Sequence, residues 1–191
     1  HGGHDPGAVS PRGLKESDVV LLVCQEAKRK LVSNGVTVFM SRESDVFIPV
    51  WQRSEMANGA EADAFVSVHA NSAKTDASGI ETFAMHNSDK GERLAGSLQD
   101  FQLDAFPSSK DRGVKYRAFS VLRKTKMPAA LVELEFIHTF KGDAHFKDAV
   151  NIRRHADALA SGILAYLGIE EHDSDVPITS DTDSVVLAGG R

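Results

Sequence analysis

The sequence predicts an α/β domain built on a mostly parallel sheet, with helices on both faces. Strand-like and helix-like segments alternate along residues 1–168, and this alternation is typical of a parallel sheet whose crossover connections are helices. The chain has 191 residues, of which 41% are hydrophobic and 26% charged. That length and composition suit one globular domain with its own core. The apolar runs are short and interrupted by charges, so we expect no insertion into a membrane.

The first half of the chain predicts two helices and two strands. Residues 14–32 carry apolar side chains at helical spacing and stop before an Asn-Gly pair, which often ends a helix. The single cysteine, Cys24, lies on the apolar side of this helix, so we expect it to pack in the core. Residues 36–40 predict a buried strand, residues 50–60 a helix, and residues 64–68 a second strand.

The second half of the chain continues the alternation. Residues 80–85 predict a third strand, and residues 91–103 predict a helix. Two apolar runs, residues 119–122 and 130–134, predict further strands. Residues 150–167 predict the final helix, with apolar side chains at helical spacing: Ile152, Ala156, Leu159, Ile163 and Tyr166.

The composition changes after residue 168. Residues 169–191 contain many Ser, Thr and Asp, no aromatic residue and no periodicity, so we expect a disordered acidic linker or tail there and a catalytic domain in residues 1–168. Six acids and one base in residues 170–191 give 1 − 6 = −5, the formal charge of the whole chain. The remaining body is neutral, which argues against nucleic acid as a partner.

Five side chains could carry chemistry: His1, His4, Glu16, His69 and Glu133. His69 directly follows a predicted strand, and ligands of parallel sheets collect at the carboxyl ends of strands. Two histidines and a carboxylate can hold a catalytic zinc ion and leave one position open for water. A further carboxylate must then carry the proton of that water to the leaving amine.

Each of these residues also has a simpler explanation. His69 could cap a strand, and Glu16 could be an exposed acid favoured at a helix start. Glu133 is harder to explain, because it lies in an apolar stretch where an unpaired carboxylate is costly to bury. The spacing matches no compact metal motif, so spacing alone leaves the site undecided.

Seven motifs follow one another in an order shared with one enzyme family. Their sequences are HGGHDPGA at 1–8, GLKE at 13–16, TVFMSRESD at 37–45, ADAFVSVHAN at 62–71, GIETF at 79–83, RGVK at 112–115 and PAALVELEFI at 128–137. In sequence and order they resemble the amidase-3 family of N-acetylmuramoyl-L-alanine amidases, over residues 1–168. The family is zinc-dependent and acts on bacterial peptidoglycan, the expected partner of this chain.

The resemblance implies a role for four of the candidate residues. His1, Glu16 and His69 match the family's zinc ligands, for one zinc ion per chain, and Glu133 matches its catalytic glutamate. The implied reaction is attack of zinc-bound water on the lactyl carbonyl of N-acetylmuramic acid, with release of the amine of L-alanine. Glu133 would act as general base and then as acid to the departing nitrogen.

Three further residues are candidates for substrate binding. Arg112 and Lys115 would contact carboxylates of the stem peptide, or else they are two exposed bases on a loop. Asn71 would position the substrate, or else it caps the turn after its strand. His4 occupies a variable position of the family motif, and we expect it to face solvent rather than to bind metal.

The resemblance also sets expectations for the setting of the enzyme. It implies an extracellular or cell-wall hydrolase, such as an autolysin or endolysin, and we expect a monomer to which a wall-binding domain could be joined after residue 191. Two other functions stay open. The chain could be a zinc peptidase that cuts within the stem peptide, or a catalytically inactive wall-binding module.

The sequence departs from the family pattern at three places. The family has a buried strand directly before its first ligand, so we expect that strand upstream of His1. Glu135 stands where the family usually has glycine, and His138 adds a titratable group close to the predicted site. We assign no role to either residue from the sequence.

Overall fold

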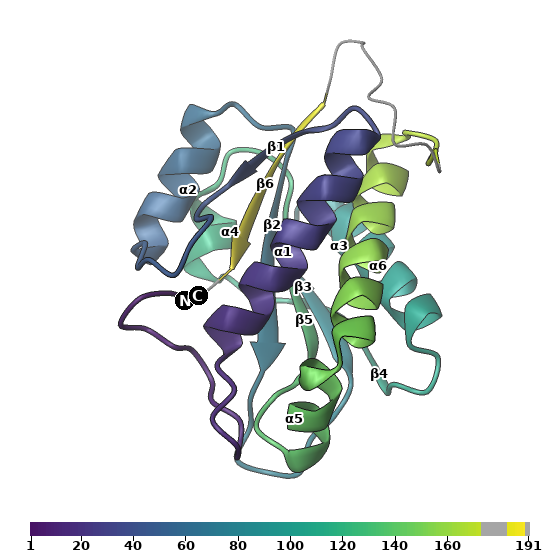
Figure 1. Ribbon diagram of the computed structural model, residues 1–191. Helices are drawn as coiled ribbons and strands as arrows, with labels where there is room; N and C mark the ends of the chain where they lie inside the picture. Colours follow the sequence, from purple (N-terminus) through teal and green to yellow (C-terminus); the bar gives the residue numbers. More distant parts are fainter. Residues whose placement is uncertain (173–182, 190–191) are drawn as a thin grey trace.

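The computed structural model describes residues 1–172 and 183–189, and it has the predicted α/β architecture. Six strands form one sheet in the order β1-β6-β2-β5-β3-β4. Four of the neighbouring pairs are parallel, and β3 pairs with β5 in the antiparallel direction. Helices lie on both faces of the sheet (Figure 1). The expectation of a mostly parallel, helix-covered sheet is therefore confirmed.

Eight elements begin within two residues of their predicted starts. They are the helices α1 (Glu16–Ser33), α2 (Val50–Gly59), α3 (Asp89–Ala105) and α6 (Ala149–Leu167), and the strands β1 (Thr37–Met40), β2 (Ala64–Asn71), β3 (Ile80–Ala84) and β5 (Ala129–Phe136). The Asn-Gly pair ends α1 as expected, with Gly35 at a φ of 84°. This left-handed conformation is one that glycine adopts without strain, and it turns the chain into β1.

Three short elements differ from the prediction. Residues 119–122 were predicted as a strand, but residues 120–122 belong to the helix α4 (Ser120–Lys124), which buries Val121 and Leu122. A four-residue apolar run fits one helical turn as well as a strand, so periodicity could not distinguish them. The strand β4 (Asp111–Tyr116) and the helix α5 (Phe140–Lys147) are also present without having been predicted, because neither carries a clear apolar pattern.

The sixth strand, β6 (Ser184–Gly189), lies within the segment expected to be an acidic tail. It pairs in parallel with both β1 and β2, so it is an inner strand of the sheet. Its side chains are buried from Val185 onward. Residues 184–189 are therefore part of the domain, which corrects the boundary placed after residue 168. Residues 173–182 and 190–191, which fall under the same expectation, lie outside the described residues.

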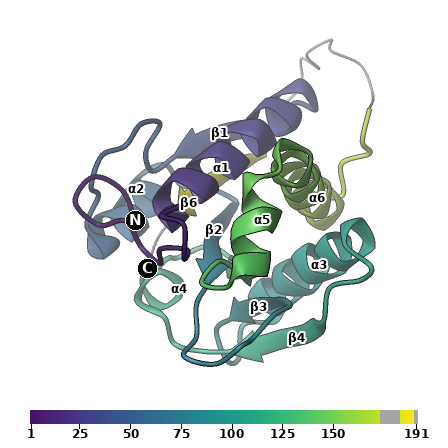
Figure 2. The ribbon, with the colours of Figure 1, turned by 60° about the horizontal axis from the view of Figure 1, so that its bottom comes forward.

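β6 occupies an inner place in the sheet beside His1, where the family resemblance implies a strand upstream of that residue. The strand lies between β1 and β2, and its last residue, Gly189, accepts a hydrogen bond from the backbone nitrogen of His1 at 2.9 Å. His1 and the end of β6 consequently lie side by side at the carboxyl end of the sheet (Figures 1 and 2). The inner position next to the first predicted ligand is thus filled from the opposite end of the sequence.

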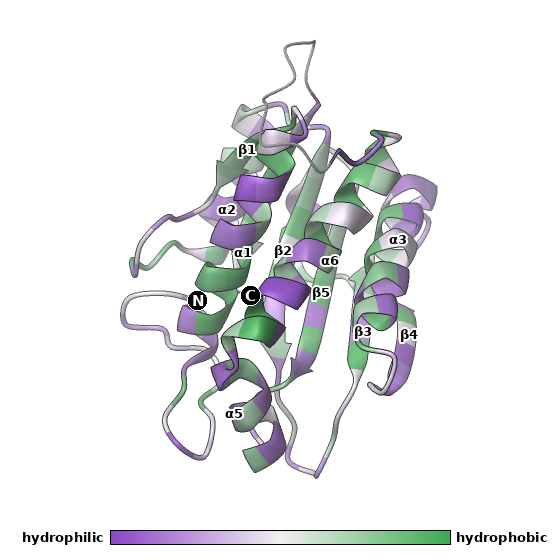
Figure 3. Cartoon of the chain, turned by 45° about the vertical axis from the view of Figure 1, so that its right-hand side comes forward, coloured by the Kyte–Doolittle hydropathy of each residue, from purple (hydrophilic) through white to green (hydrophobic). Residues whose placement is uncertain are grey.

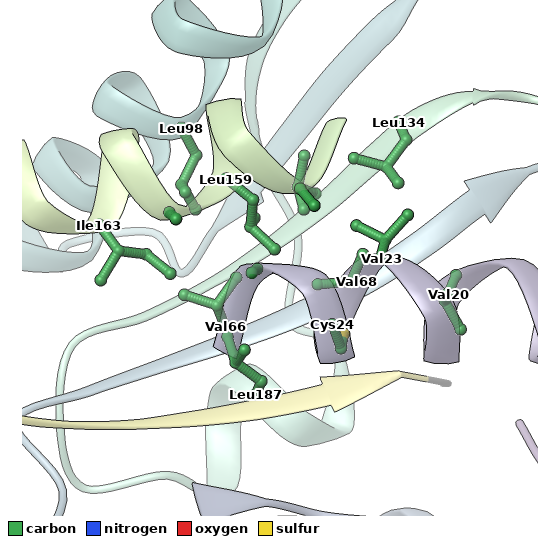
Figure 4. Packing of buried hydrophobic residues seen from close by; sticks show 14 of the residues in the cluster. Val20, Val23, Cys24, Val66, Val68, Leu98, Leu134, Leu159, Ile163 and Leu187 are labelled. Atoms are coloured by element: carbon green, nitrogen blue, oxygen red, sulfur yellow. The ribbon is translucent and has the colours of Figure 1, made fainter. Parts of the chain in front are cut away.

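Hydrophobic side chains fill both faces of the sheet. The larger cluster joins the sheet to α1, α3 and α6, and the smaller one includes residues of α2 and α4. The strands are largely apolar, whereas the outer faces of the helices carry hydrophilic residues (Figure 3). Cys24 packs in the larger cluster, as expected, and burial raises the pKa of its thiol to about 12 (Figure 4). None of the helices in the described ranges has the length and apolar character needed to cross a membrane.

We predict that Leu187→Ala lowers the free energy of unfolding by about 2 to 5 kcal/mol. Leu187 is only 1% exposed and packs in the larger cluster, so its removal leaves a cavity. Leu22→Ala is the matched control, because Leu22 is 51% exposed on α1, and it should change stability by about 0.5 kcal/mol or less. Urea unfolding measures both. Equal, small effects would contradict the placement of β6 in the core.

A buried histidine, His155, pairs with the half-buried His145 where α5 meets α6. His145 Nε2 lies 2.8 Å from His155 Nε2, and His155 Nδ1 lies 2.7 Å from Gln102 Oε1. Because the amide oxygen can only accept, His155 donates through Nδ1 and accepts through Nε2 the proton of His145. Burial lowers the pKa of His155 well below its usual value and also lowers the pKa of His145. Both rings are therefore neutral in the folded protein at neutral pH.

This pair predicts a loss of stability in mild acid. Below about pH 6.5 the histidines of the unfolded chain bind protons that the folded protein does not, so the free energy of unfolding falls with pH. Above that pH both states are neutral and the effect vanishes. His155→Gln should be less stable than the parent near neutral pH but show a smaller slope between about pH 7 and pH 5. Urea unfolding across this range gives the slopes, and identical slopes would refute the assignment.

Candidate metal centre

His1, Glu16 and His69 come together at the carboxyl end of the sheet. His69 is near the end of β2, Glu16 is the first residue of α1, and His1 adjoins the end of β6. One ligand atom from each of the three side chains lies within 4.8 Å of the other two. The fold thus brings together the three predicted ligands, which are far apart in the sequence.

Glu16 is the centre of this group. His69 Nδ1 lies 2.9 Å from Glu16 Oε1, and His1 Nε2 lies 3.4 Å from Glu16 Oε2. The backbone N–H groups of Ala8 and Ala70 also donate to this carboxylate. Burial by itself raises the pKa of Glu16, but the hydrogen bond with His69 and the charges of both histidines outweigh it, so the pKa is lowered. Glu16 is therefore ionised at neutral pH, which is the form that binds a metal.

Asp5 orients the ring of His1. Its Oδ2 lies 2.8 Å from His1 Nδ1, which leaves Nε2 directed toward Glu16. Burial raises the pKa of Asp5, but the hydrogen bonds from His1 and from the Gly7 backbone outweigh it and the pKa is lowered. A carboxylate behind a ligating imidazole is the usual arrangement at protein metal sites, because it fixes the tautomer of the ring. Sequence reasoning assigned Asp5 no role, although its place four residues after a candidate histidine was available as a signal.

We predict that Asp5→Ala weakens by about 10- to 100-fold the zinc binding expected at this site, because the His1 ring loses the partner that fixes its orientation. Asp18→Ala is the control, since Asp18 lies exposed in the first turn of α1 and outside the metal group. Competition with a chromophoric chelator measures both affinities. If the two variants bind zinc equally well, Asp5 does not position His1.

Arg53 contacts the end of β6 and the adjacent backbone of His1. Its Nη1 donates to the carbonyl oxygen of Gly189 and to Ser41 Oγ, and its Nη2 lies 3.5 Å from the carbonyl oxygen of His1. Burial lowers the pKa of Arg53 to about 10, so the guanidinium is still charged at neutral pH. β6 and this arginine together hold the backbone of the first predicted ligand. A cation on the buried side of α2 was the signal that could have identified Arg53.

Glu133 lies on β5, which pairs with β2, the strand that carries His69. The strand register pairs Glu133 with His69 on one side and with Glu81 of β3 on the other. Its side chain is 0% exposed to bulk solvent in the folded chain. It lines a cavity of about 320 Å³ together with His1, Glu16 and Asn71. The predicted base and two of the predicted ligands therefore share one cavity.

The three predicted substrate-binding residues meet at a carboxylate that received no predicted role, Glu81. Asn71 Nδ2 donates to Glu81 Oε1 at 2.8 Å, and Arg112 Nε and Lys115 Nζ both donate to Oε2. Burial raises the pKa of Glu81, but the hydrogen bonds from Lys115, Arg112 and Asn71 outweigh it and the pKa is lowered. The two bases belong to β4 and are paired with an acid, so they are not free bases on a loop. A charged residue inside the GIETF strand was the available signal for Glu81.

The remaining candidates lie outside the metal group found among the described residues. His4 is exposed, as expected. Glu135 accepts a hydrogen bond from the backbone N–H of Gly79. His138 Nε2 lies 2.8 Å from the carbonyl oxygen of Thr75. Glu135 and His138 thus both contact the loop that joins β2 to β3.

Comparison with known proteins identifies relatives over nearly the whole chain. Residues 1–165 match the sequence profile of a family described as N-acetylmuramoyl-L-alanine amidase. The amidase LytC of Bacillus subtilis is 35% identical over 169 residues, which cover 87% of this chain and 34% of LytC. The endolysin of Bacillus phage SPP1 is 35% identical over 201 residues, covering 98% of this chain and 73% of the endolysin.

Solved structures show the same fold. The amidase AmiC2 of Nostoc punctiforme superimposes with a TM-score of 0.83 at 35% identity, covering 88% of this chain and 93% of AmiC2. The catalytic domain of the amidase CwlV from Bacillus (Paenibacillus) polymyxa gives a TM-score of 0.84 at 31% identity, covering 89% of this chain and 95% of that domain.

Proposed function

The chain belongs to the amidase-3 family of N-acetylmuramoyl-L-alanine amidases, and from that premise we propose that it is a zinc-dependent enzyme that hydrolyses the amide bond between N-acetylmuramic acid and L-alanine in peptidoglycan. The observation that carries the proposal is the cavity shared by His1, Glu16 and Glu133, with His69 in contact with Glu16. Two histidines and an ionised carboxylate fit a catalytic zinc ion, because this donor set leaves one position open.

The residues of the cavity divide the reaction between binding and proton transfer. A zinc ion held by His1, Glu16 and His69 would supply Lewis-acid activation of a water molecule and of the scissile carbonyl. Glu133 accepts a proton from the attacking water as the new carbon–oxygen bond forms. The same carboxyl then gives that proton to the nitrogen of L-alanine as the carbon–nitrogen bond breaks.

The position of Glu133 suits this double role. Neighbouring strands lie about 4.8 Å apart, so the backbone of the base is one strand spacing from that of His69. A side chain on an inner strand is also held more rigidly than one on a loop. Its burial keeps bulk water away from the carboxylate, so the proton it accepts is that of the reacting water.

Wall digestion with and without a chelator tests the metal dependence. The zinc-loaded protein should solubilise purified cell walls. Removal of the metal by a chelator, followed by dialysis, should abolish this activity. Adding back one equivalent of zinc per chain should restore it, whereas magnesium should not, because the nitrogen ligands of this site favour zinc. Undiminished digestion by metal-free protein would refute the zinc-dependent mechanism.

We further propose that the protein acts at the bacterial cell wall as a monomer, with zinc as its cofactor. Its relatives include a phage endolysin and an amidase of which this chain covers about one third, so a further wall-binding domain in the same polypeptide is compatible with the family. A peptidase acting within the stem peptide would use the same ligands and differs only in its products. The inactive-module alternative is disfavoured because all four catalytic positions carry the residues that the chemistry needs.

A further inference from the structure

We propose that Arg112, oriented by Glu81, forms a carboxylate-binding subsite beside the metal centre, and that this subsite selects stem peptides whose second residue carries a free α-carboxylate. The inference rests on the proposed amidase function and deepens it, because it specifies which chemical form of the substrate the site prefers. Three features of the structure carry it: the net charge of the Glu81 group, the unused donors of Arg112, and the place of both relative to Glu133.

The group formed by Glu81, Arg112 and Lys115 has a net positive charge. Both cations donate to the same oxygen of one carboxylate, so two positive charges face one negative charge and the sum is +1. The chain as a whole has a formal charge of −5. Within this group the excess positive charge favours an anionic ligand, in contrast to the overall charge of the chain.

The guanidinium of Arg112 is fixed in a way that leaves its terminal donors for a ligand. Only Nε contacts Glu81, at 2.6 Å, while the guanidinium carbon lies over the ring of Phe136, 5.0 Å from its centre. Neither terminal nitrogen has a hydrogen-bond or ion-pair partner within residues 1–172 or 183–189. The side chain is 26% exposed, so a ligand can reach it. Two parallel N–H donors match the two oxygens of a carboxylate.

The subsite lies at the right distance from the base for the second stem residue. Glu81 faces Glu133 across the β3–β5 pair, and β4 is the next strand. Two strand spacings place the Arg112 backbone about 10 Å from β5, and its side chain points back toward Glu81. An extended peptide advances about 3.5 Å per residue. A stem peptide that runs from Glu133 toward β4 therefore brings its second residue within reach of the guanidinium.

The chemistry of that second residue makes the selection testable. It is a glutamate joined to the next residue through its side-chain carboxyl, so its α-carboxyl group is either free or amidated. The free carboxylate pairs with both terminal donors of Arg112 and with the positive charge. The carboxamide is neutral, offers one acceptor oxygen, and turns an NH₂ group toward donors that it cannot satisfy.

Binding of two soluble muropeptides that differ only in this amidation tests the proposal. The zinc-loaded Glu133→Gln protein serves as the parent, so that the ligands are bound and not cut. We expect the free-acid form to bind about 10-fold more tightly than the amide, the size of one charge-assisted pair. Arg112→Gln should abolish the difference. Arg112→Lys should also reduce it to about 2-fold or less, because lysine keeps the charge but lacks the planar fork.

Lys110→Gln is the matched control, since it removes an exposed cation two residues away that makes no contact with Glu81. It should preserve the preference. Equal binding of both muropeptides by the parent would overturn the subsite. So would a loss of the free-acid preference in Lys110→Gln as large as that in Arg112→Gln. Full preference in Arg112→Lys would show that the paired donors of the guanidinium are not what selects the carboxylate.

The preference is a ratio of two affinities within one variant, so partial unfolding does not mimic it. The binding result is also independent of hydrolysis, and failure of the amidase proposal would appear separately in digestion assays.

Discussion

Replacement of Glu133 by glutamine is expected to lower kcat by about 100- to 10,000-fold, the usual contribution of a general acid–base group. Glutamine has nearly the same shape, but it can neither accept the proton of water nor return it to the leaving nitrogen. Glu133 lies on an inner strand, buried in the cavity that also contains His1 and Glu16. We therefore expect the variant to fold and to bind zinc as the parent does.

Glu135→Gln is the matched control for this prediction. Glu135 is two residues away on the same strand, but its carboxylate is occupied by the backbone N–H groups of Gly79 and Phe136. Its replacement should lower kcat much less than replacement of Glu133. Steady-state kinetics on a soluble muropeptide, with zinc content measured on the same samples, compares the two. A Glu133→Gln enzyme with near-parental kcat would show that another group transfers the proton.

His69→Ala is the second substitution with a large expected effect. It removes one of the three proposed ligand side chains, so zinc should fall well below one ion per chain and activity should be lost. The loss should reach beyond the metal, because His69 is also the partner that helps to keep Glu16 ionised in its buried position. A buried carboxylate without that partner is costly, and we expect the metal-free variant to unfold at a lower urea concentration than the metal-free parent.

His4→Ala distinguishes a specific ligand from a general need for histidine near the N-terminus. His4 is exposed and its ring lies against Phe47, with the two ring centres 4.1 Å apart. The variant should retain one zinc ion per chain and most of its activity. Elemental analysis after gel filtration gives the stoichiometry. Stoichiometric zinc in His69→Ala, or its loss in His4→Ala, would contradict the assigned ligand set.

Local sequence patterns predicted the long elements of the fold but not the short ones. α1 and α6 carry several turns of apolar periodicity, and β2 and β5 are long buried runs, so each pattern is unambiguous. α4 is too short for its period to be read. β6 could not be predicted for a different reason: its place depends on pairing with β1 and β2, which lie more than a hundred residues earlier in the chain.

The predicted site shows the same division. Family resemblance selected four site residues: His1, Glu16, His69 and Glu133. Their spacing in the sequence could not show that they form one site, because they meet only when β2, β5 and α1 pack together. The residues that hold them were not predicted. The sequence marks Asp5, Arg53 and Glu81 only as polar residues at unusual places. Their partners are set by strand register and helix packing, which no local pattern contains.

The identity of the amino terminus released from peptidoglycan tests the central claim most directly. Walls are digested with the zinc-loaded protein, and the newly exposed amines are labelled, hydrolysed and identified, with Glu133→Gln digested in parallel. We predict new amino-terminal L-alanine, one for each stem peptide released, and at least about 100-fold slower release with Glu133→Gln. New termini of any other stem residue would mean that the enzyme is a peptidase, and wall binding without new termini would mean that it cuts no amide bond of the wall.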